Sequence, residues 1–169
     1  MVMATLDDLQ ISTDMLVKLC SRSLYTLDGL WFSLLEKKYG LEAALDIDIE
    51  VWRRFSLIHG KRVLKTFKIK DDNPIRALIT MLQIDPMMTI YAPQTVTLTD
   101  NKAVFRFLDC PPQKARKRDG RGEFPCKAVG TAIFTSYAEV VDPCVKLRCL
   151  TCPPDAHPPE YWCEWQYEI

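Results

Sequence analysis

Hydrophobic residues in the first 85 positions recur at the spacing of α-helices, with apolar side chains three and four residues apart. This pattern predicts three helices, at residues 12–39, 42–67 and 73–84. A kink or interruption of the first is expected near Gly29, because glycine lowers helix stability by about 1 kcal/mol relative to alanine. Gly40 and the Asp85-Pro86 pair are typical residues at which a helix ends.

After Pro86 the apolar residues alternate, which is the pattern of β-strands. Two strands, 89–99 and 102–109, flank a predicted tight turn at Asp100-Asn101. A loop is expected from 110 to 125, then a helix at 126–141 and a second strand pair at 145–149 and 162–169. The predicted fold class is α+β, with N-terminal helices packed on a small antiparallel sheet in the order helices–hairpin–helix–hairpin. Residues 1–169 are predicted to form one domain, with a helical part at 1–85 and a sheet part at 86–169.

Alternation within the last two strands predicts which side chains point inward. Cys163 alternates with Trp165, so it faces the core if the tryptophan does. Cys149 alternates in the same way with Leu147. Antiparallel pairing of the two strands would therefore place Cys149 and Cys163 on the same inner face of the sheet.

Composition and charge exclude several classes of protein. Hydrophobic residues make up 48% of the 169 positions, and 22 basic residues balance 22 acidic ones to a formal net charge of zero. The chain therefore has no basic field for nucleic acid, and its apolar stretches are too short to span a membrane. Asp7 and Asp8 argue against a secretory signal, so a cytoplasmic protein is expected.

The seven cysteines are concentrated toward the C-terminal end, where six of them lie between residues 110 and 163. Clustered cysteines without a signal peptide favour metal binding or redox chemistry, with burial in the core as the alternative. Cys149 and Cys152 form a CxxC pair that is suited to one ion. Cys163, with Cys126 or Cys110, would complete a zinc or iron–sulfur site.

A catalytic use of Cys126 is the alternative to metal binding. This residue begins a predicted helix, where the helix dipole lowers the pKa of a thiol. His157 or Glu123 would then act as the base. The sequence has none of the glycine-rich phosphate-binding motifs, so no nucleotide cofactor is expected.

A basic run at 114–121 offers a further site. Arg116, Lys117 and Arg121 are candidate ligand-binding residues for an anionic small molecule held over the cysteines. The alternative is that the run is simply a solvated surface segment.

Several cysteine–proline motifs are specific enough to compare with known families. They are Leu27–Phe32 (LDGLWF), Asp109–Arg116 (DCPPQKAR), Gly122–Lys127 (GEFPCK), Arg148–Asp155 (RCLTCPPD), His157-Pro158 and Trp162–Trp165 (WCEW). Through them almost the whole chain resembles an uncharacterised family of cytosolic proteins from anaerobic bacteria and archaea.

The segment from Cys152 to Trp165 also resembles the C-terminal tails of two better-known groups. One is the small-molecule-binding domains of the 4-vinyl reductase type, whose helices pack against a small antiparallel sheet. The other is the L-2-amino-thiazoline-4-carboxylate hydrolase family, which opens a cyclic precursor to a cysteine derivative. The glycine that usually lies between the two cysteines of those tails is replaced here by a proline-rich loop.

Two functions are therefore expected. The first is a small-molecule-binding or sensor-like domain with a C-terminal cysteine metal site. The second is a small hydrolase or transferase that uses a cysteine nucleophile on a small, thiazoline-like substrate. The sequence leaves open which of the two applies and whether the chain forms a homodimer.

Overall fold

The computed structural model describes residues 10–169, so Asp7 and Asp8 lie outside the described residues. The helices are α1 (Thr13–Tyr39), α2 (Leu41–Phe67), α3 (Pro74–Ile84), α4 (Pro111–Arg118) and α5 (Lys127–Val141), with a 3-10 turn η1 at Thr89–Tyr91. The strands are β1 (Pro93–Leu98), β2 (Lys102–Phe107), β3 (Lys146–Thr151) and β4 (Cys163–Glu168). The predicted α+β class is thereby confirmed.

The four strands form one antiparallel sheet in the order β1-β2-β4-β3. Trp165 lies at its centre, opposite Phe105 on one side and Cys149 on the other. Cys149 and Cys163 both pack against the core cluster, as the alternation predicted.

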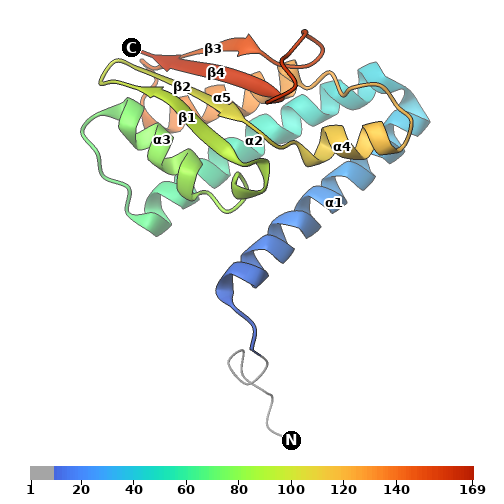
Figure 1. The fold of residues 1–169 in the computed structure, drawn as a ribbon, viewed down its shortest axis with the longest axis horizontal. Helices are drawn as coiled ribbons and strands as arrows, with labels where there is room; N and C mark the ends of the chain where they lie inside the picture. Colours follow the sequence, from blue (N-terminus) through green and yellow to red (C-terminus); the bar gives the residue numbers. More distant parts are fainter. Residues whose placement is uncertain (1–9) are drawn as a thin grey trace, which may run out of the picture.

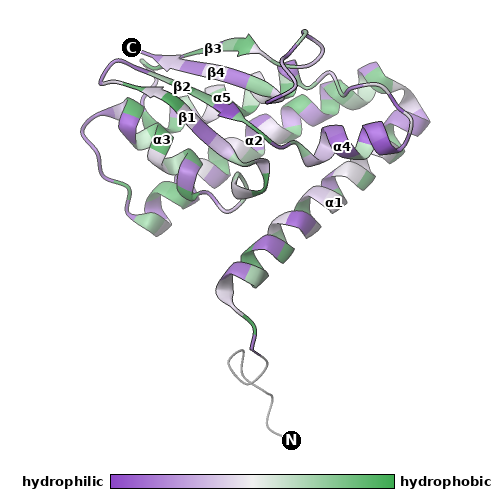
Figure 2. Cartoon of the chain, viewed as in Figure 1, coloured by the Kyte–Doolittle hydropathy of each residue, from purple (hydrophilic) through white to green (hydrophobic). Residues whose placement is uncertain are grey.

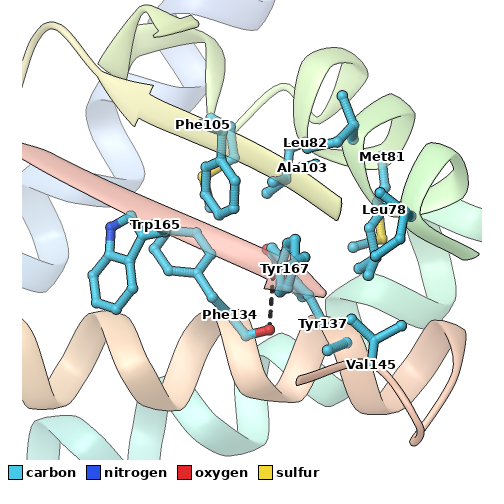
Figure 3. Close-up of a cluster of buried hydrophobic side chains, with 14 of the residues drawn as sticks. Leu78, Met81, Leu82, Ala103, Phe105, Phe134, Tyr137, Val145, Trp165 and Tyr167 are labelled. Atoms are coloured by element: carbon cyan, nitrogen blue, oxygen red, sulfur yellow. Dashed lines mark hydrogen bonds between the residues drawn. The ribbon is translucent and has the colours of Figure 1, made fainter. Parts of the chain in front are cut away.

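The core lies between this sheet and the helices α3 and α5, with α2 packed against α5 (Figure 1). Phe105, Trp165 and Tyr167 of the sheet meet Phe134 of α5. The Tyr167 hydroxyl donates a hydrogen bond of 2.9 Å to the Phe134 carbonyl, drawn in Figure 3. This bond gives the buried hydroxyl a partner that it would otherwise lack.

Helix α1 is continuous through Gly29, where a kink or interruption was predicted. A Cβ at Gly29 would meet no atom within 4 Å, so the position is open. Ser12 caps the helix by accepting a hydrogen bond from the Met15 amide, and its first turns extend beyond the rest of the fold (Figure 1). None of the helices in residues 10–169 is long and apolar enough to cross a membrane.

Two local predictions are wrong. The predicted loop at 110–125 contains helix α4, because Pro111 and Pro112 occupy the first helical turn, where no amide donor is needed. The basic run therefore lies partly on a helix. Residues 89–91, predicted as strand, instead form the turn η1 that leads into β1.

Candidate functional site

A cavity of about 870 Å³ lies among α1, α2, α4, α5 and the inner ends of β2 and β4. Aromatic side chains form much of its wall, namely Tyr25, Phe32, Trp52, Tyr91, Phe124 and Trp165. A mostly apolar cavity of this size with a few polar groups is typical of small-molecule sites.

Four of the predicted metal ligands line this cavity: Cys110, Cys126, Cys152 and Cys163. The Sγ atoms of Cys126 and Cys152 are 3.5 Å apart. Cys163 also lies beside Cys152, close enough to influence its pKa. The CxxC partner Cys149 is not part of the cavity wall, so the structure pairs Cys152 with Cys126 rather than with Cys149.

Cys126 is the N-cap residue of α5, and Gln113 of α4 holds it in place. Gln113 is 1% exposed, and its side-chain oxygen accepts a 2.8 Å hydrogen bond from the Phe124 amide. Its Nε2 donates to the Phe124 carbonyl at 2.8 Å and to the Cys126 Sγ at 3.4 Å. Gln113 therefore fixes the segment that carries the thiol. Nothing in the sequence pattern marks this glutamine as special.

The two neighbouring thiols differ in acidity. Hydrogen bonding with the Cys152 thiol and with Gln113 lowers the pKa of Cys126, and the N-terminal end of α5 acts in the same direction. Hydrogen bonding with Cys126 and Cys163, together with burial, raises the pKa of Cys152. Cys126 is thus the more acidic thiol of the pair. Burial raises the pKa of Cys110.

The cysteines predicted to bind a metal are not arranged as a set of ligands around one ion. Within residues 10–169, no three His, Cys, Asp or Glu side chains are grouped so that they could hold a metal ion. Zinc or iron–sulfur binding therefore stays a prediction.

The predicted bases lie together, and the charge of Glu123 acts to raise the pKa of Cys126. His157 Nε2 is 3.5 Å from the Glu123 Oε1, and its Nδ1 contacts the Pro158 and Tyr161 carbonyls at 2.9 and 3.0 Å. Neither His157 nor Glu123 belongs to the cavity wall. Their role as bases stays a prediction.

Two of the three predicted anion-binding residues reach the cavity mouth. Arg116 and Arg121 line it, and both pair with the carboxylate of Glu36 on α1, at 2.8 and 3.1 Å. Lys117 is exposed outside the cavity wall. The positive charge that was expected to meet a ligand is therefore largely used to join α4 to α1.

Two acidic residues that the sequence did not single out face the cavity. Asp28 of α1 and Asp48 of α2 both line it, and the indole of Trp52 lies beside both carboxyl groups. Burial raises the pKa of Asp28 to about 6. Burial, together with the charge of Asp28, raises the pKa of Asp48 to about 7. On the sequence they look like ordinary acidic positions of helices.

Trp165 adds an unsatisfied hydrogen-bond donor to the cavity wall. Its side chain is 1% exposed, and its Nε1 has no hydrogen-bond partner within the described part of the chain. Figure 3 shows this nitrogen turned away from the other labelled core side chains. A Cβ at Gly130 would lie 2.7 Å from the indole, so only glycine leaves room for the ring there.

The fold and this site define an α+β protein with a partly open, thiol-lined cavity between its helices and its sheet. The chain belongs to a family of unknown function, DUF6125, whose model matches residues 9–169. No curated protein and no solved structure shows significant similarity to it.

Proposed function

We propose that this protein binds a small organic molecule in the cavity, with the Cys126–Cys152 pair at one end of the ligand. The observation that carries the proposal is the Trp165 indole N–H, which is buried, unpaired and part of the cavity wall. A buried donor without a partner costs about 1–3 kcal/mol. A ligand with an acceptor atom at this place would recover that energy.

Binding of a neutral fluorescent dye, N-phenyl-1-naphthylamine, tests the proposal. Ala115→Phe places a large side chain in the cavity wall on α4 and is expected to weaken dye binding at least tenfold. Ala156→Phe, at an exposed loop position, is the matched control and should bind like the wild type. Equal binding by all three proteins would show that the dye does not use the cavity and would reject the proposal.

Thiol chemistry in the same cavity is the second candidate function. The observation that favours it is the lowered pKa of Cys126, whose Sγ lies 3.5 Å from the Cys152 Sγ. The Cys126 sulfur would bond to an electrophilic carbon of the ligand while the leaving group departs with its electron pair. In a hydrolase, water would later displace the sulfur.

Brief iodoacetamide treatment followed by peptide mass spectrometry tests this second candidate. Cys126 is expected to react several times faster than the exposed Cys20, which serves as an internal reference. Slower labelling of Cys126 than of Cys20 would argue against a catalytic thiol.

A metal ion at the thiols would need Cys152, Cys126 and Cys163 to come closer together, because within residues 10–169 they are not grouped as a ligand set. Metal analysis and a visible spectrum of protein purified without oxygen test this part of the proposal. Zinc or iron near one per chain, lost in Cys152→Ser, would support it. Metal-free protein with dye binding intact would reject the metal and leave the cavity as the functional site.

A further inference from the structure

We propose that the ligand carries a positively charged nitrogen, a primary ammonium or an amidinium, which binds at Asp28 and Asp48. This inference rests on the proposed function, since it names the chemical class of molecule that the cavity takes. It follows from two acidic side chains of the cavity wall, Asp28 and Asp48, that form no ion pair within residues 10–169. The basic side chains of the same wall are Lys18, Arg22, Lys114, Arg116, Arg118 and Arg121.

The two carboxyl groups have no cationic partner of their own. In residues 10–169 neither Asp28 nor Asp48 forms an ion pair, although Asp48 is only 8% exposed. Buried carboxylates in proteins are normally paired, because removing an unpaired charge from water is costly. Here the space beside them is the cavity, so a ligand can supply the missing charge.

Other partly or fully buried acids of this protein show the usual compensation. Asp85 is 0% exposed and is bound by His59 at 3.0 Å, by the Tyr137 hydroxyl at 3.2 Å and by the Met87 amide at 2.9 Å. Glu36 has two arginine partners. The fold therefore satisfies its acids where they serve structure alone, and the pair at the cavity is the exception.

The surroundings of the pair favour an organic cation. The rings of Tyr25 and Trp52 stack with centroids 5.8 Å apart, and both line the cavity beside the two acids. Aromatic faces attract ammonium groups and pack against the carbon atoms attached to them. Trp165, in the same wall, offers a donor to a second, acceptor-bearing part of the ligand.

Matched pairs of small aryl compounds test the inference by displacement of the dye. Benzylamine, phenethylamine and 3-phenylpropylamine are compared with the corresponding alcohols at about pH 8, where the amines are charged. We expect at least one amine to displace the dye at a concentration tenfold below that of its alcohol. Asp48→Asn should reduce this ratio to near one, whereas Asn at the exposed Asp46 of the same helix should preserve it.

The outcomes separate the two proposals. A dye that occupies the cavity but is displaced no better by any amine than by its alcohol overturns the inference and leaves the ligand-binding function standing. The same holds if Asp48→Asn and Asp28→Asn both keep the preference. Dye binding that ignores Ala115→Phe instead rejects the ligand-binding function itself.

A second inference rests on helix α1 and does not depend on the cavity. Eight large hydrophobic side chains of α1 are between 38% and 64% exposed: Met15, Leu19, Leu24, Leu27, Leu30, Trp31, Leu34 and Tyr39. At about 100° per residue all of them except Tyr39, the last residue of the helix, fall within one half of the helix circumference. Hydrophobic positions recur along this helix in Figure 2, including the part that extends beyond the body.

The geometry points to a second copy of this chain as the partner of that face. Leu24, Leu27, Trp31 and Leu34 follow one another at spacings of three, four and three residues, which is the seam of paired helices. With roughly 100 Å² exposed by each of the seven side chains other than Tyr39, the face offers about 700 Å². A standard interface buries about 800 Å² per partner, so two copies joined along α1 approach that size.

Light scattering during size-exclusion chromatography tests this second inference. The wild type is expected to elute as a dimer, and Leu27→Glu with Trp31→Glu as a monomer with unchanged far-UV circular dichroism. Leu98→Glu, at an equally exposed hydrophobic position on β1, is the control and should remain dimeric. A monomeric wild type, or a dimer that survives the double substitution, would overturn the inference.

Discussion

Replacing Asp48 by asparagine should make the protein more stable at alkaline pH. Asparagine keeps the size of the side chain but cannot ionise. In the folded protein the pKa of Asp48 is raised from 3.8 to about 7, whereas in the unfolded chain the carboxyl ionises near its usual value. Between these values the folded state holds a proton that the unfolded state has lost, so stability falls as pH rises.

The size of the effect follows from the shift. Roughly three pKa units at 1.4 kcal/mol each give an upper limit of about 4 kcal/mol, reached above the folded pKa. Part of the shift comes from the neighbouring Asp28, and the protein can relax around a charge, so we expect about 2–3 kcal/mol at pH 8. Near pH 4 the folded chain is protonated at this group and the unfolded chain is only about half ionised, so little of the difference has developed and the variant should differ little from the wild type.

Urea unfolding of both proteins at several pH values between about 4 and 8 measures this difference. Titrating groups other than Asp28, whose charge is coupled to that of Asp48, contribute equally to the two proteins and cancel in the comparison. Asn at the exposed Asp46 should show no such pH-dependent gain. A variant that is less stable than the wild type at pH 8, or a difference that is constant with pH, would refute the reasoning.

Three further substitutions test the packing around the cavity. Gly130→Ala should lower the free energy of unfolding by about 1–3 kcal/mol and alter the near-UV circular dichroism, because its Cβ would lie 2.7 Å from the Trp165 ring. An unchanged unfolding curve and an unchanged spectrum would contradict this close approach. Gln113→Leu should raise the pKa of Cys126, because the hydrogen bond from Gln113 to the sulfur is lost. The pH dependence of iodoacetamide labelling at Cys126 measures this pKa, and an unshifted profile would show that Gln113 does not affect it. Arg116→Met removes the ion pair with Glu36 of α1 and should therefore speed hydrogen exchange of the α4 amides at 111–118. Lys114→Met is the exposed control. Equal exchange in both variants would show that the Arg116–Glu36 ion pair does not stabilise α4.

Most secondary structure could be predicted because it depends on neighbouring residues. The spacing of apolar positions and the capping residues predicted α1, α2, α3 and α5 to within a few residues, and alternation predicted three of the strands closely. Helix α4 escaped because Pro111 and Pro112 also fit the end of a strand. Whether this segment is helical depends on the contacts of Gln113 and Arg116 with Phe124 and Glu36, which lie 11 and 80 residues away in the sequence.

The candidate site could be predicted only in part. The sequence selected Cys126, Cys152 and Cys163 by their clustering, and the structure brings all three to one cavity. It also favoured Cys149 as the partner of Cys152, because a CxxC spacing brings two thiols together only when a turn follows. Here Cys149 lies within β3 opposite Trp165, so the strand and its pairing decide where its side chain points.

The sequence by itself determined most of the elements of this protein and their order, because periodicity records local burial. Helix α4 and the exposed apolar face of α1 are the exceptions. Only the tertiary structure decided that Asp28 and Asp48, twenty residues apart on two helices, line one cavity and form no ion pair within residues 10–169. It also decided that a tryptophan N–H from the last strand lines the same space. Such a site depends on how distant segments pack, and no local pattern of residues encodes that arrangement.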